Sequence, residues 1–360
     1  MQWTQHGDRI GFSSVAFGNG THVTVGNASN SFTSADGVTW ERHDLGPLRL
    51  SGPLAYGGGT FVAAGTSSNV FTSSDGVLWS PQSTGTNLGL NGIAHGSNTF
   101  VIAANNGLVL SSSNAVQWQL RSTPSTNPVY NVAWTGREFI FVTAQAEFLR
   151  SSNLVQWTTQ QIATNSSSNS YSFPGIAQGQ GQYVLVGNHQ STAFDFIVNE
   201  GVIATSSNAV NWSLQSFPQL SGFARVTFAY GAFVAIGERG AIYTSTNGII
   251  WTAASPVTTR NLSGICFGKG RFVAVGDFNA IVQSGFHGPP VLAGAWRTPA
   301  GLALEVGAGP GQNCQLQYAD TLLPPDWQNL QSFTTAEQPF RFTNAVPPKA
   351  VHRFYRVATF

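Results

Sequence analysis

The sequence predicts an all-β protein, a seven-bladed β-propeller closed by its N-terminal strand and followed by a small antiparallel β-sandwich. The first observation is a repeat of about 40 residues with strand-like content, which is typical of propellers. Tryptophans mark the repeat at spacings of 37, 39, 39, 39, 55 and 39 residues: Trp3, Trp40, Trp79, Trp118, Trp157, Trp212 and Trp251. The second observation is that no segment shows the periodicity of an amphipathic helix.

Each repeat contains three short apolar runs, and a fourth strand is expected to start at the tryptophan. In the second repeat these runs cover residues 50–56, 60–64 and 69–73, with the glycines 57–59 between the first two. Glycine-rich segments of this length are typical of β-hairpin turns. The first two runs are almost continuously apolar, which suits strands that are buried on both faces between neighbouring blades.

The N-terminus is expected to complete the last blade. Residues 262–284 supply three strands, but the following residues 285–290 lack the tryptophan motif. Trp3 precedes the first strand of the first repeat, so we expect its strand to pair with the third strand of blade seven, near residues 280–283. A ring closed in this way leaves no unpaired edge. The alternative, an open solenoid, would need polar caps at both ends.

Two domains are expected, at residues 1–287 and 288–360. Seven repeats occupy roughly the first 285 residues, and Pro289-Pro290 then interrupts the pattern. The remaining residues alternate inward-facing and outward-facing side chains, as strands of a small sandwich do. These alternating stretches are residues 302–306, 314–318, 340–342 and 353–357.

The composition is poor in charge. Charged residues make up 9% of the chain and the formal net charge is +1, whereas about a quarter of an average globular protein is charged. We therefore expect no nucleic-acid partner and, without an apolar run of about 18 residues, no membrane insertion. We expect a monomer that is extracellular or on the cell surface, cut from a longer precursor, since Met1 is followed by no signal peptide. Cys266 and Cys314 are expected to be separate buried thiols, and no cofactor or metal is expected.

A turn motif precedes most of the tryptophans, as in residues 73–79, Ser-Ser-Asp-Gly-Val-Leu-Trp. The Asp or Asn side chain is expected to accept hydrogen bonds from turn amides, the glycine to allow a positive φ, and the tryptophan to cover the turn. We interpret the acidic and amide residues of these turns as structural, together with the seven tryptophans. They are Asp36, Asp75, Asn114, Asn153, Asn208 and Asn247.

The turn resembles the Asp-box, or BNR, repeat of sialidase-like propellers, and the resemblance covers blades one to six. It departs by one residue from the fuller Ser-x-Asp-x-Gly-x-x-Trp form. Residues 315–327 and 353–357 look like parts of the small sandwiches that end large secreted bacterial surface proteins. The resemblance to sialidases implies three substrate-binding arginines, a tyrosine nucleophile and an Arg-Ile-Pro motif. Here Arg9-Ile10 is followed by Gly11, and the arginines do not recur at the expected places, so we expect no sialidase activity.

A binding site is expected on the rim opposite the Asp-box turns. Strand alternation brings the second-to-third-strand loops and the inter-blade connections together there, and we call it the loop rim. Loops on one face of a ring can form a ligand-binding funnel, although charges in loops can also be merely solvated. The candidate ligand-binding residues are Arg42, Arg49, Glu147, Phe194, Asp195, Phe196, Glu200, Glu238, Arg239 and Asp277.

Blade five is longer than the others, with a tryptophan spacing of 55 residues where 39 is usual. The additional residues fall at 166–171 and 188–201. Long loops with aromatic residues of their own are often functional, so we expect this insertion to form one wall of the site. The alternative is a surface loop or a segment that packs on the C-terminal domain.

For function, the sequence favours a non-catalytic extracellular module that binds a glycan or a protein, or a rigid spacer in a larger surface protein. The alternative is a glycoside hydrolase that uses carboxylates of the loop rim. Such an enzyme needs two carboxyl groups about 5 to 10 Å apart. The candidates for that pair are Glu147, Asp195, Glu200, Glu238 and Asp277.

Overall fold

The computed structural model describes residues 3–6, 11–26, 29–65, 68–193, 196–285, 291–298, 301–307, 313–321, 326–334, 340–344 and 353–359. The chain divides into two compact units, one of which contains Gln2–Gly268 and Phe272–Gln283 and the other Ser284–Phe360. The expected domain boundary at 287/288 falls outside the described residues and stays a prediction.

The first unit is an all-β propeller, as predicted. Its described residues form seven four-stranded sheets, and each of the first six contains four strands that follow one another in the chain. Blade one contains β2 (Phe12–Gly18), β3 (Thr21–Gly26), β4 (Asn30–Ser34) and β5 (Glu41–Asp44). Blade two contains β6 (Leu54–Gly57), β7 (Thr60–Ala64), β8 (Asn69–Ser73) and β9 (Ser80–Ser83). Blade three contains β10 (Leu90–Gly96), β11 (Thr99–Ala104), β12 (Leu108–Ser112) and β13 (Gln119–Ser122).

The next three blades follow the same plan. Blade four contains β14 (Val129–Trp134), β15 (Phe139–Thr143), β16 (Glu147–Ser151) and β17 (Thr158–Gln161). Blade five contains β18 (Asn169–Gly179), β19 (Gln182–Ala193), β20 (Phe196–Ser206) and β21 (Ser213–Phe217). Blade six contains β22 (Phe223–Ala229), β23 (Ala232–Gly237), the short 3-10 helix η2 (Glu238–Gly240), β24 (Ile242–Ser245) and β25 (Thr252–Ala253).

Blade seven joins the two ends of the propeller. Its strands are β26 (Leu262–Gly268), β27 (Arg271–Gly276) and β28 (Ile281–Ser284), with η3 (Asp277–Asn279) between the last two, and β1 (Trp3–His6) is its fourth strand beside β28. The predicted pairing of the N-terminal strand is therefore confirmed. The side chain of Trp3 lies outside what the structure describes.

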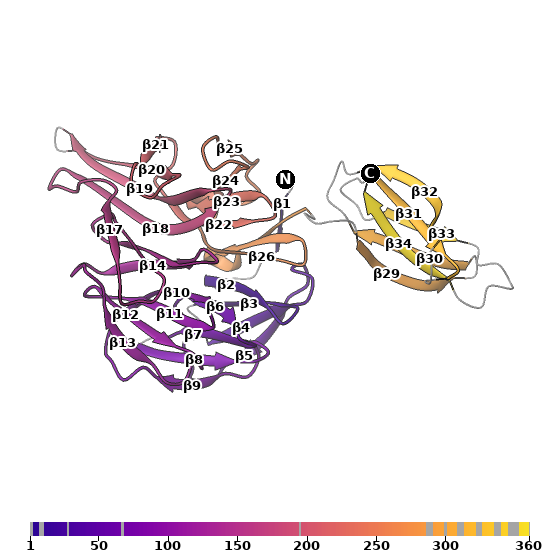
Figure 1. The fold of residues 1–360 in the computed structure, drawn as a ribbon, viewed down its shortest axis with the longest axis horizontal. Coiled ribbons are helices and arrows are strands. Elements are labelled where there is room, and N and C mark those ends of the chain that lie inside the picture. Colours follow the sequence, from indigo (N-terminus) through magenta and orange to yellow (C-terminus); the bar gives the residue numbers. More distant parts are fainter. Residues whose placement is uncertain are drawn as a thin grey trace. The chain divides into compact units, whose positions relative to one another are not determined.

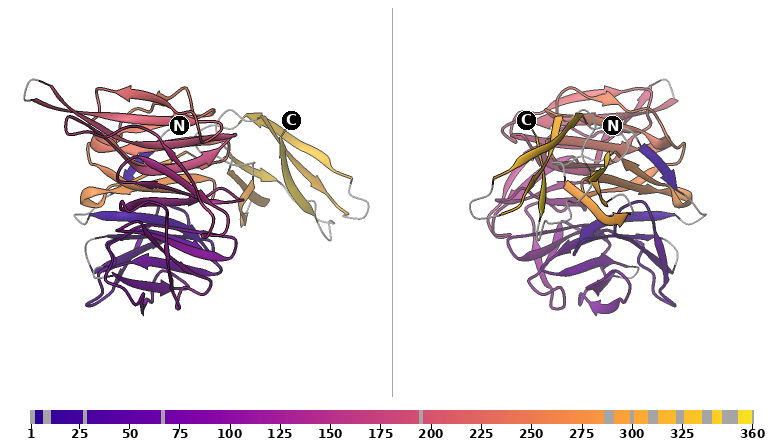
Figure 2. Two further views of the ribbon diagram at one scale, coloured as in Figure 1. Left: turned by 60° about the vertical axis from the view of Figure 1, so that its left-hand side comes forward. Right: turned by 90° about the vertical axis from the view of Figure 1, so that its right-hand side faces the viewer.

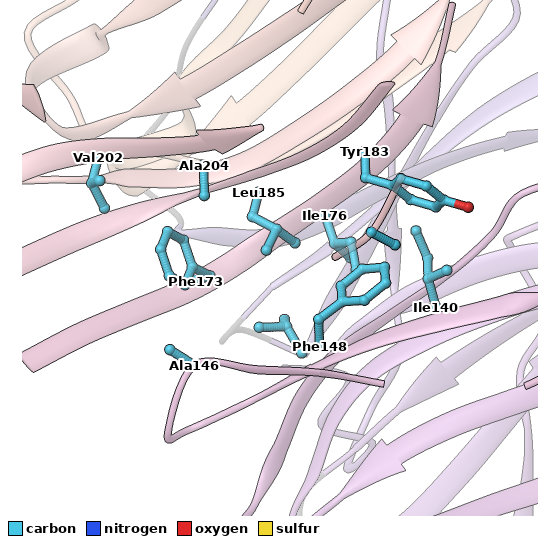
Figure 3. Packing of buried hydrophobic residues seen from close by; sticks show 11 residues of the cluster. Ile140, Ala146, Phe148, Phe173, Ile176, Tyr183, Leu185, Val202 and Ala204 are labelled. Carbon is cyan, nitrogen blue, oxygen red and sulfur yellow. The ribbon is translucent and has the colours of Figure 1, made fainter. Parts of the chain in front are cut away.

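The first strands of successive blades contact one another around the ring, from β2 through β6, β10, β14, β18 and β22 to β26, and β26 contacts β2. Figure 1 shows β26, in orange, beside β2, in indigo. Side chains fill the space between blades. Between blades four and five, Phe148 packs edge-on against Tyr183 at a centroid distance of 5.4 Å, close to Phe173 and Ile176 (Figure 3). Burial of this kind supplies most of the stability of a propeller.

The C-terminal unit contains two three-stranded antiparallel sheets. The first contains β29 (Val291–Thr298), β30 (Gly301–Gly307) and β33 (Phe340–Asn344), and the second β31 (Asn313–Ala319), β32 (Gln328–Thr334) and β34 (Phe354–Thr359). At the ends of β31 and β34, Arg353 forms an ion pair with Asp320 at 2.7 Å. Cys266 and Cys314 are both free thiols.

The Asp-box turns have the hydrogen bonds that the motif predicts. Asp75 Oδ1 accepts hydrogen bonds from the amides of Val77 and Leu78 at 2.8 and 3.0 Å, and Ser73 Oγ accepts one from the Gly76 amide at 2.8 Å. The Trp79 indole donates to the Gly76 carbonyl at 3.0 Å. The same pair of amide hydrogen bonds occurs at Asp36, Asn114, Asn153, Asn208 and Asn247.

Three of these turns have no glycine at the position of Gly76, yet their residues also adopt a positive φ: Ala115, Leu154 and Ala209. Trp118 and Trp212 follow the turns of Ala115 and Ala209, and their indole nitrogens are buried without an acceptor among the described residues. At Gly76 itself a Cβ atom would lie 2.4 Å from Val23 of blade one. The Asp-box turn therefore also contacts the preceding blade, and at Gly76 this contact leaves no room for a Cβ atom.

Replacing Asp75 by alanine should destabilise the propeller by about 1 to 2 kcal/mol, because two turn amides lose their acceptor. Asp75→Asn is the matched control, since Asn114 accepts the same two bonds at 3.0 and 2.9 Å in blade three. We expect Asp75→Asn to unfold at nearly the wild-type urea concentration. Equal midpoints for Asp75→Ala and wild type would show that the turn does not need its cap.

Deletion of residues 1–6 should lower the melting temperature and broaden the transition, because β28 becomes an open edge and the ring loses its closure. Differential scanning calorimetry measures both effects. An unchanged, cooperative transition in the shortened chain would contradict a structural role for β1.

Candidate functional site

The innermost strands share an irregularity where they begin at the loop rim. The register of β2, β10, β14, β18 and β22 against their neighbours shifts at a bulge, for example between Phe223 and Arg225. A bulge leaves the extra residue unpaired and redirects nearby side chains. In these five blades one residue is placed in this way at the mouth of the central channel.

The bulge residues, together with the equivalent residues of blades two and seven, line two adjoining cavities. The first, which we call the mouth cavity, has a volume of about 450 Å³ and takes one equivalent residue from each of the first five blades: Ser13, Gly52, Asn91, Tyr130 and Pro174. The second, the side cavity, has a volume of about 480 Å³ and continues the series with Ala224 and Ser263. Pro174 and Arg225 line both cavities. The site is thus a preformed hollow at the channel mouth.

Side chains beside the mouth form hydrogen bonds from one blade to the backbone of the next. Ser263 of blade seven donates to the Phe12 carbonyl at 2.6 Å, and Asn91 of blade three donates to the Val129 carbonyl at 2.9 Å. Blades one and two are connected by the bond from Ser13 to the Gly52 carbonyl (3.4 Å) and by the bond from the Leu54 amide to Ser14 (3.1 Å). The Pro174 carbonyl of blade five accepts hydrogen bonds from Asn131 of blade four (2.8 Å) and from Arg225 of blade six (3.1 Å). These bonds fix the blades around the mouth.

Arg225 is the cation of the mouth. Its Nη1 donates to the carbonyls of Pro174 and Ala224 at 3.1 and 2.9 Å. Burial lowers the pKa of its guanidinium, yet an arginine stays charged at any ordinary pH. Among the described residues it forms no ion pair. The mouth therefore holds a positive charge that only carbonyl dipoles balance.

The blade-five insertion forms an arm. β19 and β20 continue as a hairpin to the pair Ala193 and Phe196, while β21 pairs with β20 only as far as Gly201. Figure 1 and Figure 2 show this hairpin projecting from the ring. Near its tip Phe196, Ile197 and Val198 are 74%, 64% and 49% exposed. At its base Asn188 and Asn199 line the side cavity.

The other face of the arm carries a polar cluster. His189 Nδ1 lies 2.8 Å from the Glu200 carboxylate and its ring stacks on Tyr171 at 4.2 Å, while Nε2 is hydrogen-bonded to Asn169. Glu200 also accepts a hydrogen bond from Ser216 at 3.0 Å. These contacts hold the base of the arm against β18 and β21. Glu200, predicted as a ligand-binding residue, is thus already engaged within blade five.

Glu147 caps a loop of blade four. Its Oε2 accepts hydrogen bonds from Ser125, from Asn127 at 3.1 Å and from Thr143 at 2.7 Å. Burial opposes ionisation and is the largest single influence, but the three hydrogen bonds together outweigh it and lower the pKa of Glu147. The carboxylate therefore stays ionised and serves as an acceptor for the inter-blade segment.

The remaining predicted site residues lie at separate places. Glu238 is exposed and lines the side cavity. Arg239 and Asp277 are connected through Asn261, whose oxygen accepts from the Arg239 amide at 3.0 Å and whose nitrogen donates to Asp277 at 3.1 Å. The outer-strand Arg42 and the neighbouring Arg49 are exposed, and neither lines the two cavities. Phe194 and Asp195 lie outside the described residues.

Sequence reasoning missed Arg225, and it included Asn188 and Asn199 in the predicted insertion without naming them as site residues. Arg225 lies in a largely apolar first strand, FARVTFA, whereas the sequence predicts a site formed by loops of the loop rim. Alignment of the repeats would have found it, because the equivalent positions hold small or polar uncharged residues or proline: Ser14, Pro53, Gly92, Asn131, Gly175 and Gly264. A cation at this position departs from the repeat, and the strand can form without it, as the uncharged residues of the other blades show.

The part of the chain that the structure describes contains no group of three or more His, Cys, Asp and Glu residues placed to bind a metal ion. Within the same residues there is no helix of sufficient length and apolar character to cross a bilayer.

Solved structures of low sequence identity share the fold. YCF48 bound to D1 peptide has a TM-score of 0.60 and 15% identity, over 80% of this chain and 94% of that chain. YCF48 from Cyanidioschyzon merolae has a TM-score of 0.56 and 17% identity, over 80% and 99%. The WD40 domain of Neurospora crassa Pan2 has 0.57 and 12%, over 78% and 94%. These similarities show a β-propeller fold. No protein-family model and no curated protein sequence matches the chain.

Acid should destabilise the propeller partly through Glu147. Its folded pKa lies below the ordinary value of 4.5, so its contribution is fully present above that value and is lost as the pH falls through the folded pKa. In Glu147→Gln, urea unfolding should depend less on pH between about pH 5 and 3 than in wild type. Glu41→Gln, an exposed change on β5, is the control. Identical pH dependence of wild type and Glu147→Gln would contradict this role.

Proposed function

We propose that the propeller is a non-catalytic module that binds an extended segment of another protein across the loop rim. The observation that carries the proposal is the arm of blade five. Its outer strand continues past the end of β21, so residues 196–199 have no strand partner on that side among the described residues. An unpaired strand edge with exposed apolar side chains is a template for the addition of another strand.

The arm leads directly to the cavities at the channel mouth. Asn199 belongs to the unpaired part of β20 and also lines the side cavity, and Asn188 lies beside it. Neither amide side chain has a hydrogen-bond partner among the described residues, so both are free to bond a peptide backbone. A protein segment that pairs with β20 would lie on the β21 side of the arm and would reach the side cavity across the face of the arm that carries Asn199. The rigid blades would make its binding less costly in entropy.

A peptide suits this surface better than a glycan. A strand edge offers alternating N–H and C=O groups that another peptide can pair with and a sugar cannot match in register. Phe196, Ile197 and Val198 add apolar contacts beside that edge. The known structure of YCF48 with a D1 peptide is of a protein with the same fold, and it supports the proposal by analogy only.

The glycoside hydrolase alternative is less well supported. A glycosidase needs a carboxyl group whose pKa is raised so that it can donate a proton. Glu147 has a lowered pKa and three hydrogen-bond donors around it, and Glu200 is engaged by His189 and Ser216. Two of the five candidate carboxylates therefore have structural partners that oppose the chemistry.

Three finer features of the protein are also proposals. The six Asp-box hydrogen-bond networks support a relationship to BNR propellers. The low charge of the chain supports a location outside the cell or on its surface. A glycan ligand is the alternative outcome that the experiment below distinguishes from a protein segment.

Selection from a phage-displayed peptide library on the full chain, with a glycan array in parallel, tests the proposal. We expect peptides with extended, apolar motifs and an affinity that falls at least tenfold, about 1.4 kcal/mol, in Phe196→Lys/Ile197→Lys. The matched control is Ile249→Lys/Ile250→Lys, an apolar pair that is 54% and 70% exposed on an Asp-box turn of the opposite rim, which should bind normally. Failure to select any peptide, equal weakening by both double variants, or binding of glycans alone would overturn the proposal.

A further inference from the structure

We infer that Arg225 anchors an anion site in the mouth cavity that accepts a carboxylate of the bound protein segment. The inference rests on the proposed function for the nature of the ligand, and on the following geometry for the site itself.

The guanidinium has donors to spare. Arginine carries five N–H donors in a planar fork that matches the two oxygens of a carboxylate. In this protein Nη1 is bonded to the carbonyls of Pro174 and Ala224, while Nε and Nη2 have no partner among the described residues. Neither of these two nitrogens is among the buried side-chain atoms that lack a hydrogen-bond partner. Both are therefore accessible from outside the protein, and Arg225 lines both cavities.

The positive charge is incompletely compensated. Arg225 is half-buried and burial disfavours its charged form, yet it forms no ion pair with any described acidic side chain. A partly desolvated charge without a counterion is costly to the protein, and an incoming anion recovers part of that cost. The guanidinium is therefore poised for an anionic partner from outside the chain.

The inter-blade bond of Arg225 does not by itself explain a long cation at this position. The Pro174 carbonyl, which Arg225 contacts, already accepts a hydrogen bond from Asn131 at 2.8 Å. The other blades have uncharged residues at the equivalent position of the repeat, such as Gly92 and Gly264. A long cation in a first strand, where a glycine suffices elsewhere, points to binding rather than to closure.

The neighbouring charges decide where the anion enters. Glu238 lines the side cavity together with Arg225, and its carboxylate would repel a second carboxylate there. Among the described residues no acidic side chain lines the mouth cavity, whose polar wall includes Ser13, Asn91 and Tyr130. The carboxylate is therefore expected on the mouth side of Arg225. An acidic side chain and a C-terminus both supply this group, and the experiment distinguishes them.

The site can be tested with the full chain and simple anions. In arginine ¹⁵N-labelled protein, the Nε–Hε signal that disappears in Arg225→Gln identifies Arg225. We expect this signal to shift with sodium acetate and to stay in place with sodium chloride at equal ionic strength. The absence of a shift with acetate, or an equal shift with both salts, would overturn the anion site.

Peptides then test the proposed source of the carboxylate. The probes are hexaglutamate with blocked ends, hexaglutamine with blocked ends, and hexaglutamine with a free C-terminus, each with an uncharged fluorophore, measured by anisotropy. An acidic side chain as the source predicts that only hexaglutamate binds, and a C-terminus predicts that the third peptide binds and the second does not. Binding of blocked hexaglutamine as tight as that of the other two would contradict a carboxylate anchor.

Variants complete the test. Arg225→Gln should weaken the bound peptide at least tenfold, and Arg225→Lys should lie between, because lysine keeps the charge and loses the fork. Arg137→Gln, a charge removal at an exposed turn, is the control and should bind as wild type. Cooperative melting of each variant shows that it is folded. Library peptides that bind Arg225→Gln as tightly as wild type would overturn the inference and leave the proposed function standing. An acetate shift without any selected peptide would support the anion site and overturn the proposed function.

Discussion

Blades one, two, four and five each have a backbone carbonyl at the loop rim that accepts a hydrogen bond from a side chain of a neighbouring blade, and the structure of the mouth depends on these bonds. Buried peptide groups without partners are costly, and here the partners come from the neighbouring blade. Ser263 bonds the Phe12 carbonyl across the junction of the last and first blades, and Asn131 bonds the Pro174 carbonyl. These bonds set the angle between blades at the channel, while the apolar interfaces supply the bulk of the stability.

This arrangement allows one position of the repeat to vary without loss of the ring. Glycine, serine, asparagine and proline all occur there, and each leaves a mouth of different polarity. Arg225 keeps the inter-blade bond to Pro174 and adds a charge that the ring does not use. A scaffold of rigid repeats can therefore acquire a binding group at its axis at little structural cost, in the same way that loops acquire function on other folds.

Much of the fold could be predicted from the sequence, because the tryptophan period and the Asp-box turns are local signals. The turn at Asp75 is built from residues within seven positions of one another, and the missing motif after Ser284 was sufficient to place β1. The site could be predicted less well. The partners of Glu147 include Ser125 and Asn127, which reach it only through the tertiary structure. The role of Arg225 depends on the geometry of a bulge that no local sequence pattern predicts. Two of the predicted residues of the arm, Phe194 and Asp195, lie outside the described residues.

Site-specific photo-crosslinking tests most directly whether the loop rim holds the protein segment. A benzophenone amino acid replaces Tyr130, which lines the mouth cavity, or Tyr230, an exposed residue in the turn between β22 and β23 on the opposite rim. With a library-selected peptide bound, the account predicts a crosslink from position 130 and none from position 230. A crosslink from position 230 alone, with binding intact, would contradict it.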